Sequence, residues 1–177
     1  MIKTVPLIFC IALTSAAQTV SPLAIWLDKA NQGDASAQFW LGAAYESGRG
    51  IKRDFAQAIK WLGKSAKQGN PDAEFLLGQM YEDAEGLPQD HVEAAEWFRV
   101  ACENRPDRGG SGQGCNELGL LYLDGKGVKR NFVEAYKYFK IAGSGTNLNI
   151  VKRSMTAAEV AEANRQTQQW VETHPDQ

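Results

Sequence analysis

The side chains of this 177-residue sequence that could do chemistry are few and poorly grouped. A serine acyl-transfer enzyme needs Ser-x-x-Lys or Gly-x-Ser-x-Gly, and no serine here has either pattern. His91 and His174 have no second histidine or cysteine at metal-ligand spacing, so we interpret both as solvated surface residues. The glycine-rich stretch 109–114 lacks the Gly-Lys-Ser/Thr ending of a phosphate loop and is interpreted as a flexible insertion. The sequence therefore predicts no catalysis, no metal and no cofactor.

The first seventeen residues have the anatomy of a secretory signal peptide. Lys3 supplies a positive start, a short apolar run follows at 6–13, and Ser15-Ala16-Ala17 provides the small residues of a cleavage site. The run is far shorter than the ~20 apolar residues that a membrane-spanning helix requires. We therefore expect cleavage after Ala17 and export, into the periplasm of a Gram-negative bacterium.

The strongest signal in the rest of the chain is one pattern repeated three times. Each copy contains a Leu-Gly pair, a tyrosine three residues later, a turn with glycine, an Asp or Asn, and finally a tryptophan or tyrosine. The second copy follows the first by 36 residues and the third follows the second by 41. The copies align at Leu41-Gly42-x2-Tyr45, Leu77-Gly78-x2-Tyr81 and Leu118-Gly119-x2-Tyr122, and they end at Trp61, Trp97 and Tyr138.

This register resembles the Sel1-like repeat, a relative of the tetratricopeptide repeat, over about residues 24–143. The resemblance implies an all-α fold, a right-handed α-solenoid of Sel1-like helix-turn-helix repeats with about three full repeats and flanking helices. It divides the chain into a signal peptide at 1–17, a repeat array at 18–143, and a linker with a C-terminal capping helix at 144–177.

The residues themselves support the same helices. Ala37, Leu41 and Tyr45 lie four apart, on one stripe of a helix, and Gly42 lets a neighbouring helix approach closely. Asp or Asn precedes each second helix as a good N-cap, at Asp54, Asp90 and Asn131. We expect no strand and eight helices, at about 22–31, 35–47, 54–68, 71–83, 90–104, 115–124, 131–142 and 156–173.

Three local expectations follow from this alignment. Trp61 and Trp97 are predicted to be largely buried between helices. Ala84 stands where the other copies have a turn glycine, so that turn is predicted to be strained or differently shaped. Gly114 stands where the other copies have alanine, so the sixth helix is predicted to start late.

The resemblance also implies where a ligand binds. Tetratricopeptide repeats bind ligands in a concave groove lined by the first helix of each pair. The candidate partner-binding residues at matching positions are Phe39, Glu46, Asp72, Phe75, Gln79, Glu82, Asp83 and Asp124. These include five acids and no base, so the expected partner carries basic and apolar groups. An alternative interpretation places Phe39 and Phe75 in the core between adjacent first helices.

Two cysteines, Cys102 and Cys115, remain after the signal peptide is removed. An even count in an exported chain favours a disulfide, and the ends of successive antiparallel helices bring these positions together. The rival interpretation is a pair of buried free thiols, since position 102 is equivalent to Ala66 and cysteine often behaves as a small hydrophobe.

The predicted function is that of an exported protein–protein interaction module. It would bind a protein or cell-envelope component through the concave face. The net charge of −2 provides no strong basic surface for nucleic acid, and no segment of the mature chain is apolar enough to span a membrane. One alternative is a periplasmic inhibitor or immunity protein against a secreted effector. A less favoured one, a β-lactam- or cell-wall-directed enzyme, follows from cysteine-rich relatives to which such activity has been assigned.

Overall fold

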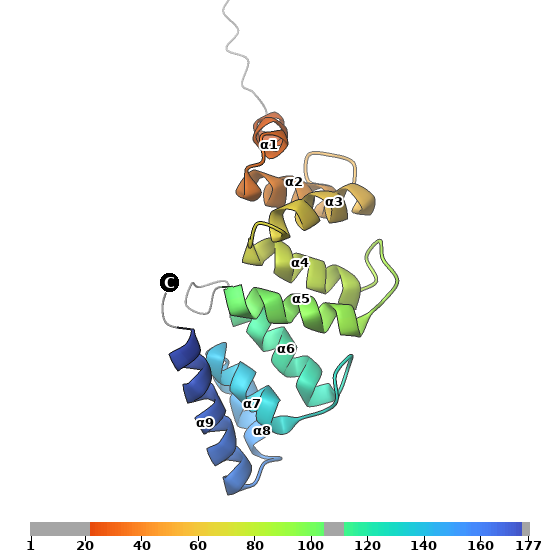
Figure 1. Cartoon of the computed structure of the whole chain (residues 1–177). Coiled ribbons are helices and arrows are strands. Elements are labelled where there is room, and N and C mark those ends of the chain that lie inside the picture. The colour runs from red at the N-terminus through yellow and green to blue at the C-terminus, as the bar shows by residue number, and fades with distance from the viewer. Residues whose placement is uncertain (1–21, 105–111, 175–177) are drawn as a thin grey trace, which may run out of the picture.

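The computed structural model describes residues 22–104 and 112–174, and within them it contains nine helices and no strand (Figure 1). The helices are α1 (Pro22–Asn31), α2 (Ala35–Ser47), α3 (Phe55–Ala66), α4 (Pro71–Glu82), α5 (His91–Asn104), α6 (Gly112–Asp124), α7 (Phe132–Ile141), α8 (Gly145–Lys152) and α9 (Ala157–Thr173).

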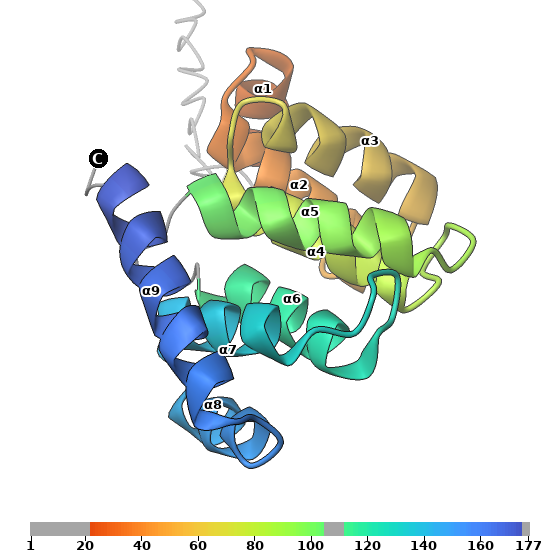
Figure 2. The same cartoon turned by 60° about the horizontal axis from the view of Figure 1, so that its bottom comes forward.

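Each helix from α1 to α7 packs against the next one along the chain, and α9 packs against α7. The two views show this stack running from α1 at one end to the pair α8 and α9 at the other (Figures 1 and 2). The predicted α-solenoid is therefore confirmed. The signal-peptide prediction lies outside the described residues.

The helices differ from the prediction in two places. Helix α6 begins at Gly112 and so does not start late. Gly114 lies inside this helix and permits close packing, since a Cβ there would lie 3.0 Å from the Cβ of Ala101. Helix α8 lies in the predicted linker. Its Val151 is fully buried and its Asn147 donates to the side chain of Asn116 at 2.8 Å, so tertiary contacts stabilise it.

The Leu-Gly pair of each repeat is the place where its two helices meet most closely. A Cβ added to Gly42, Gly78 or Gly119 would lie 2.6–2.7 Å from a side-chain carbon of the second helix. The side chains that fill these contacts have no exposed surface, and they are Leu62, Phe98 and Phe139. The close approach predicted at Gly42 is therefore present in all three repeats.

The prediction for the tryptophans is half correct. Trp61 is 6 % exposed, whereas Trp97 is only partly buried against the neighbouring core. The deepest position belongs to the residue after the tryptophan, because that side chain points at the glycine of the first helix. In repeat two it is Phe98, not Trp97, that fills the layer.

The predicted caps and the strained turn are both present. The carboxylates of Asp54 and Asp90 and the side-chain carbonyl of Asn131 accept hydrogen bonds from backbone N–H groups of the helices that follow them. Ala84 adopts φ 61°, the left-handed region in which Gly48 and Gly125 lie at the equivalent turns. A Cβ makes that region unfavourable, so the second turn stores strain.

We expect Ala84→Gly to raise the free energy of unfolding by about 0.5–1 kcal/mol, because relief of the left-handed strain exceeds the added entropy of the unfolded chain. Urea denaturation measures this change. Gly48→Ala is the matched control, and it should lower stability by forcing the same strain on the first turn. A loss of stability in Ala84→Gly would contradict the assignment of strain.

One buried position near the start of the first helix forms a bond to a neighbouring helix in all three repeats. In repeat one Gln38 donates to the carbonyl of Ala30 at 3.1 Å and accepts from Gln68 at 2.8 Å. In repeat three the equivalent residue is Cys115, which forms the predicted disulfide with Cys102, at a Cα separation of 4.7 Å. The residue at this position thus forms hydrogen bonds in repeat one and a covalent bond in repeat three.

In repeat two this position is Glu74, which is 1 % exposed. It accepts from Asn104 at 2.6 Å, but its second oxygen has no hydrogen-bond partner. Burial raises the pKa of this carboxyl above its ordinary value. The folded state therefore binds the proton more tightly than the unfolded state, so the contribution of Glu74 to stability falls as pH rises through its folded pKa.

We expect Glu74→Gln to raise the free energy of unfolding at pH 7.5 by about 1–3 kcal/mol, because an amide removes a buried unpaired charged oxygen. Wild type should gain stability between pH 7.5 and pH 5, and the variant should gain less. Thermal unfolding at both pH values measures this, with Glu103→Gln on the exposed surface of α5 as control. Equal pH profiles for wild type and Glu74→Gln would contradict the prediction.

Candidate partner-binding face

The first helices of the repeats end in acids. Glu46 lies in the last turn of α2, Glu82 ends α4, Asp83 follows it as the C-cap, and Asp124 ends α6. None of these three helices has a basic residue in its last turn, whereas the second helices α3 and α7 carry Lys64 and Lys140 there. Because the C-terminus of a helix carries partial negative charge, these acids oppose the helix dipole.

The structure brings some of these acids close to others that the sequence did not single out. Glu117 on α6 lies near Glu82 and Asp83, and burial together with these two charges raises its pKa. Glu46 lies against Glu85, and burial followed by that neighbour raises the pKa of Glu46. The repeat pattern conceals Glu117, because the equivalent positions hold Trp40 and Leu76.

Bases offset the charge unevenly along this face. Arg49 and Arg53 act on Glu46 to lower its pKa, although less than burial raises it. Asp124 pairs with Lys126 at 3.4 Å. The groups acting on Glu117 are two acids and the amide of Asn116, and none is cationic. We call Glu82, Asp83 and Glu117 the acidic cluster, since it is the least compensated part of the face.

Asp72, another of the predicted acids, lies apart from the acidic cluster. Asp72 is in the first turn of α4, so it lies about 15 Å along the helix from Glu82. With Ser36 it lines a small polar depression of about 240 Å³ between the first turns of α2 and α4. Gln79 lies between the two ends and is partly buried. The predicted residues of α4 are therefore spread along the helix and do not form one compact site.

The two predicted aromatic residues belong in part to the core. Phe39 packs on the cluster formed by α3 and α4, and Phe75 packs on Phe98 with 5.7 Å between ring centroids. Both rings keep some exposed surface. Their core role is thus visible in the structure, and a contact with a partner stays a prediction.

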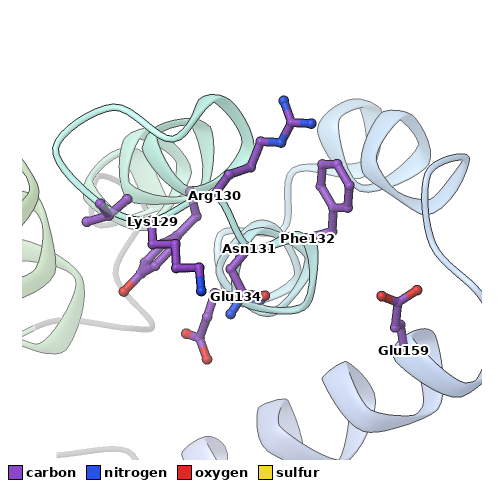
Figure 3. A pocket seen from close by; sticks show the side chains of 8 residues that line it. Lys129, Arg130, Asn131, Phe132, Glu134 and Glu159 are labelled. Atoms are coloured by element: carbon purple, nitrogen blue, oxygen red, sulfur yellow. The ribbon is translucent and has the colours of Figure 1, made fainter.

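A larger cleft that the sequence did not indicate lies between the α6–α7 turn and the start of α9 (Figure 3). Its volume is about 730 Å³, and Lys129, Arg130, Asn131 and Glu159 are among its lining residues. Two bases face two acids, Glu134 and Glu159, so the cleft has no dominant charge. Repeat alignment could not reveal it, because Glu159 comes from α9, outside the repeated pattern.

The histidines are not fully solvated, contrary to the prediction. His91 is partly buried at the start of α5, with Gly127 directly over its carbonyl group. His174 is partly buried and stacks on Trp170 at 4.3 Å between ring centroids. In the described part of the chain no group of three or more His, Cys, Asp or Glu side chains could hold a metal ion.

Comparison with known proteins agrees with this architecture. The family model described as Sel1 repeat matches residues 35–70, 71–105 and 112–147. The crystal structure of a Sel1 repeat protein from Oxalobacter formigenes is 31 % identical, with a TM-score of 0.62, over 69 % of this chain and 48 % of that one. No curated protein matches the sequence.

A second solved structure is c5321, a protective antigen present in uropathogenic Escherichia coli strains that displays the SLR fold. It is 26 % identical, with a TM-score of 0.55, over 86 % of this chain and 41 % of its own. The chain thus spans less than half the length of either structure. Since three repeat matches cover more than half of the sequence and both neighbours share the fold, this chain belongs to the Sel1 repeat family, whose members generally mediate protein–protein interactions and are typically non-catalytic.

Proposed function

We propose that this protein is an exported binding module that holds a basic, partly apolar segment of a partner protein on the face formed by its first helices. The observation that carries the proposal is the acidic cluster. The charges of Glu82 and Asp83 disfavour the ionised form of the nearby Glu117, and both acids oppose the dipole of α4. Groups that cost stability in the free protein become favourable when a cationic partner lies over them.

The apolar part of the proposed surface comes from the exposed portions of Phe39 and Phe75, one on each side of the α2–α4 boundary. An acidic surface attracts a basic partner at long range, raises the encounter rate and weakens with salt. The proposed complex should therefore form quickly at low ionic strength and lose affinity in high salt.

The test is a charge reversal, Glu82→Lys with Asp83→Lys. We expect the free energy of unfolding of the variant to exceed that of wild type by about 1 kcal/mol, because two acids at a helix C-terminus become bases. We also expect it to retain less than a tenth of the partner that wild type captures from periplasmic extract, measured by quantitative mass spectrometry.

The matched control reverses Glu103 and Glu172 to lysine. Both are exposed acids near the C-termini of α5 and α9, so the control changes net charge and helix dipoles equally and leaves the first helices untouched. Undiminished capture by the Glu82/Asp83 variant, or capture that is indifferent to 0.5 M salt, would overturn the proposal.

Export rests on the N-terminal sequence and is supported by the disulfide, which fits an oxidising compartment. Within the described residues no helix is long and apolar enough to cross a bilayer. Mass spectrometry of the periplasmic fraction should find a chain beginning at Gln18. Retention of Lys3 in the recovered protein would show that the predicted cleavage does not occur.

A further inference from the structure

The N-terminal end of the stack is half of a repeat. Helix α1 packs on α2 through Ala30, which is 2 % exposed, as the second helix of a preceding repeat would. Its Trp26-Leu27 pair matches Trp61-Leu62. In the three complete repeats the residue after the aromatic is fully buried against a glycine twenty positions earlier, as in Leu62 against Gly42.

Helix α1 has no such partner within the described residues. Leu27 is 43 % exposed, although its equivalents Leu62, Phe98 and Phe139 have no exposed surface. Ile25 is 44 % exposed and stands where the complete repeats carry the charged residues Lys60, Glu96 and Lys137. Trp40 stacks on Trp26 with 6.0 Å between ring centroids and is 51 % exposed, whereas its equivalent Leu76 is partly buried against the core. We call Ile25, Trp26, Leu27 and Trp40 the α1 patch.

The sequence before α1 lacks the Leu-Gly pattern on which this packing depends. The position twenty residues before Leu27 is Leu7, preceded by Pro6, where each complete repeat has Leu-Gly. A leucine cannot provide the close approach that a glycine does, and a proline disrupts the interior of a helix. A second copy does not fit either, since its Gly42, Gly78 and Gly119 are already covered by its own side chains.

We propose that the α1 patch docks an amphipathic helix of a partner protein, one with a glycine between apolar residues spaced as in Leu41-Gly42-x2-Tyr45. This helix continues the packing seen three times in the molecule, with its glycine over Leu27 and its apolar stripe over Ile25 and Trp40. The patch lies at the end of the stack, away from the acidic cluster on α4 and α6, so this docking is independent of the function proposed above.

The test uses a synthetic peptide with the sequence of residues 34–49, the first helix of repeat one, and the mature protein beginning at Gln18. Isothermal titration should show saturable binding of one peptide per protein. A peptide with leucine at the position of Gly42 should bind at least tenfold more weakly, because its side chain prevents the close approach.

Leu27→Glu in the protein should also weaken binding at least tenfold while leaving the melting temperature unchanged, since Leu27 is largely exposed. Ile150→Glu, at an equally exposed apolar residue of α8, is the matched control and should bind as wild type. Absence of saturable binding, or equal binding by the leucine peptide or by Leu27→Glu, would overturn the proposal. A wild-type dimer that Leu27→Glu converts to a monomer would also overturn it in favour of self-association.

Discussion

Replacing Phe98 with alanine should lower the free energy of unfolding by about 3–5 kcal/mol, which is a large share of the stability of a domain this size. The ring has no exposed surface and lies directly over Gly78 between α4 and α5. It also contacts Phe75, at 5.7 Å between centroids. Removing it leaves a cavity that two packed helices close only in part. Equilibrium denaturation in urea measures the loss.

The adjacent residue provides the control. Trp97→Ala removes a larger side chain, but Trp97 is only partly buried, so the expected cost is smaller than for Phe98→Ala. Sequence reasoning alone expects the opposite order, because Trp97 occupies the repeated aromatic position. A larger loss in Trp97→Ala than in Phe98→Ala would show that the layer between α4 and α5 is packed differently.

A double-mutant cycle tests the same contact from the other helix. In wild type, Gly78→Ala should destabilise, because the new Cβ would lie 2.6 Å from a ring carbon of Phe98. In the Phe98→Ala background the same change should stabilise, since the methyl group enters the cavity and alanine favours helix by ~1 kcal/mol over glycine. A Gly78→Ala effect of the same sign in both backgrounds would contradict the contact.

Loss of the disulfide between Cys102 and Cys115 should cost about 3 kcal/mol, because the bond closes a loop with a sequence separation of 13 and restricts the unfolded chain. It also joins α5 to α6, where repeat two meets repeat three. The measurement compares urea denaturation of Cys102→Ala/Cys115→Ala with that of wild type in oxidising buffer.

Wild type in excess dithiothreitol is the control for this variant. Its free energy of unfolding should fall to about that of the alanine pair, since both lack the bond and keep small side chains in the buried site. Single Cys→Ser variants should fall further, because each buries a hydroxyl group in an apolar cluster. An unchanged midpoint in the alanine pair would mean that the bond contributes nothing to stability.

Sequence alone determined the repeated helices of this protein, since their signals are local. The stripe through Ala37, Leu41 and Tyr45 and the caps at Asp54, Asp90 and Asn131 each act within one or two helical turns. The disulfide was also predictable, since two cysteines were left for one bond. The strain at Ala84 followed from its alignment with turn glycines.

Tertiary structure decided what depends on the distance between helices. Phe98 is more deeply buried than Trp97 because its side chain points at Gly78. Helix α8 is stabilised by the burial of Val151. The approach of Glu117 to Glu82 and Asp83 joins residues of two repeats. Leu27 is exposed because, among the residues that the structure describes, no helix lies where its equivalents have one. A repeat pattern specifies each pair of helices, whereas charge clusters and unfilled ends arise from how the pairs stack.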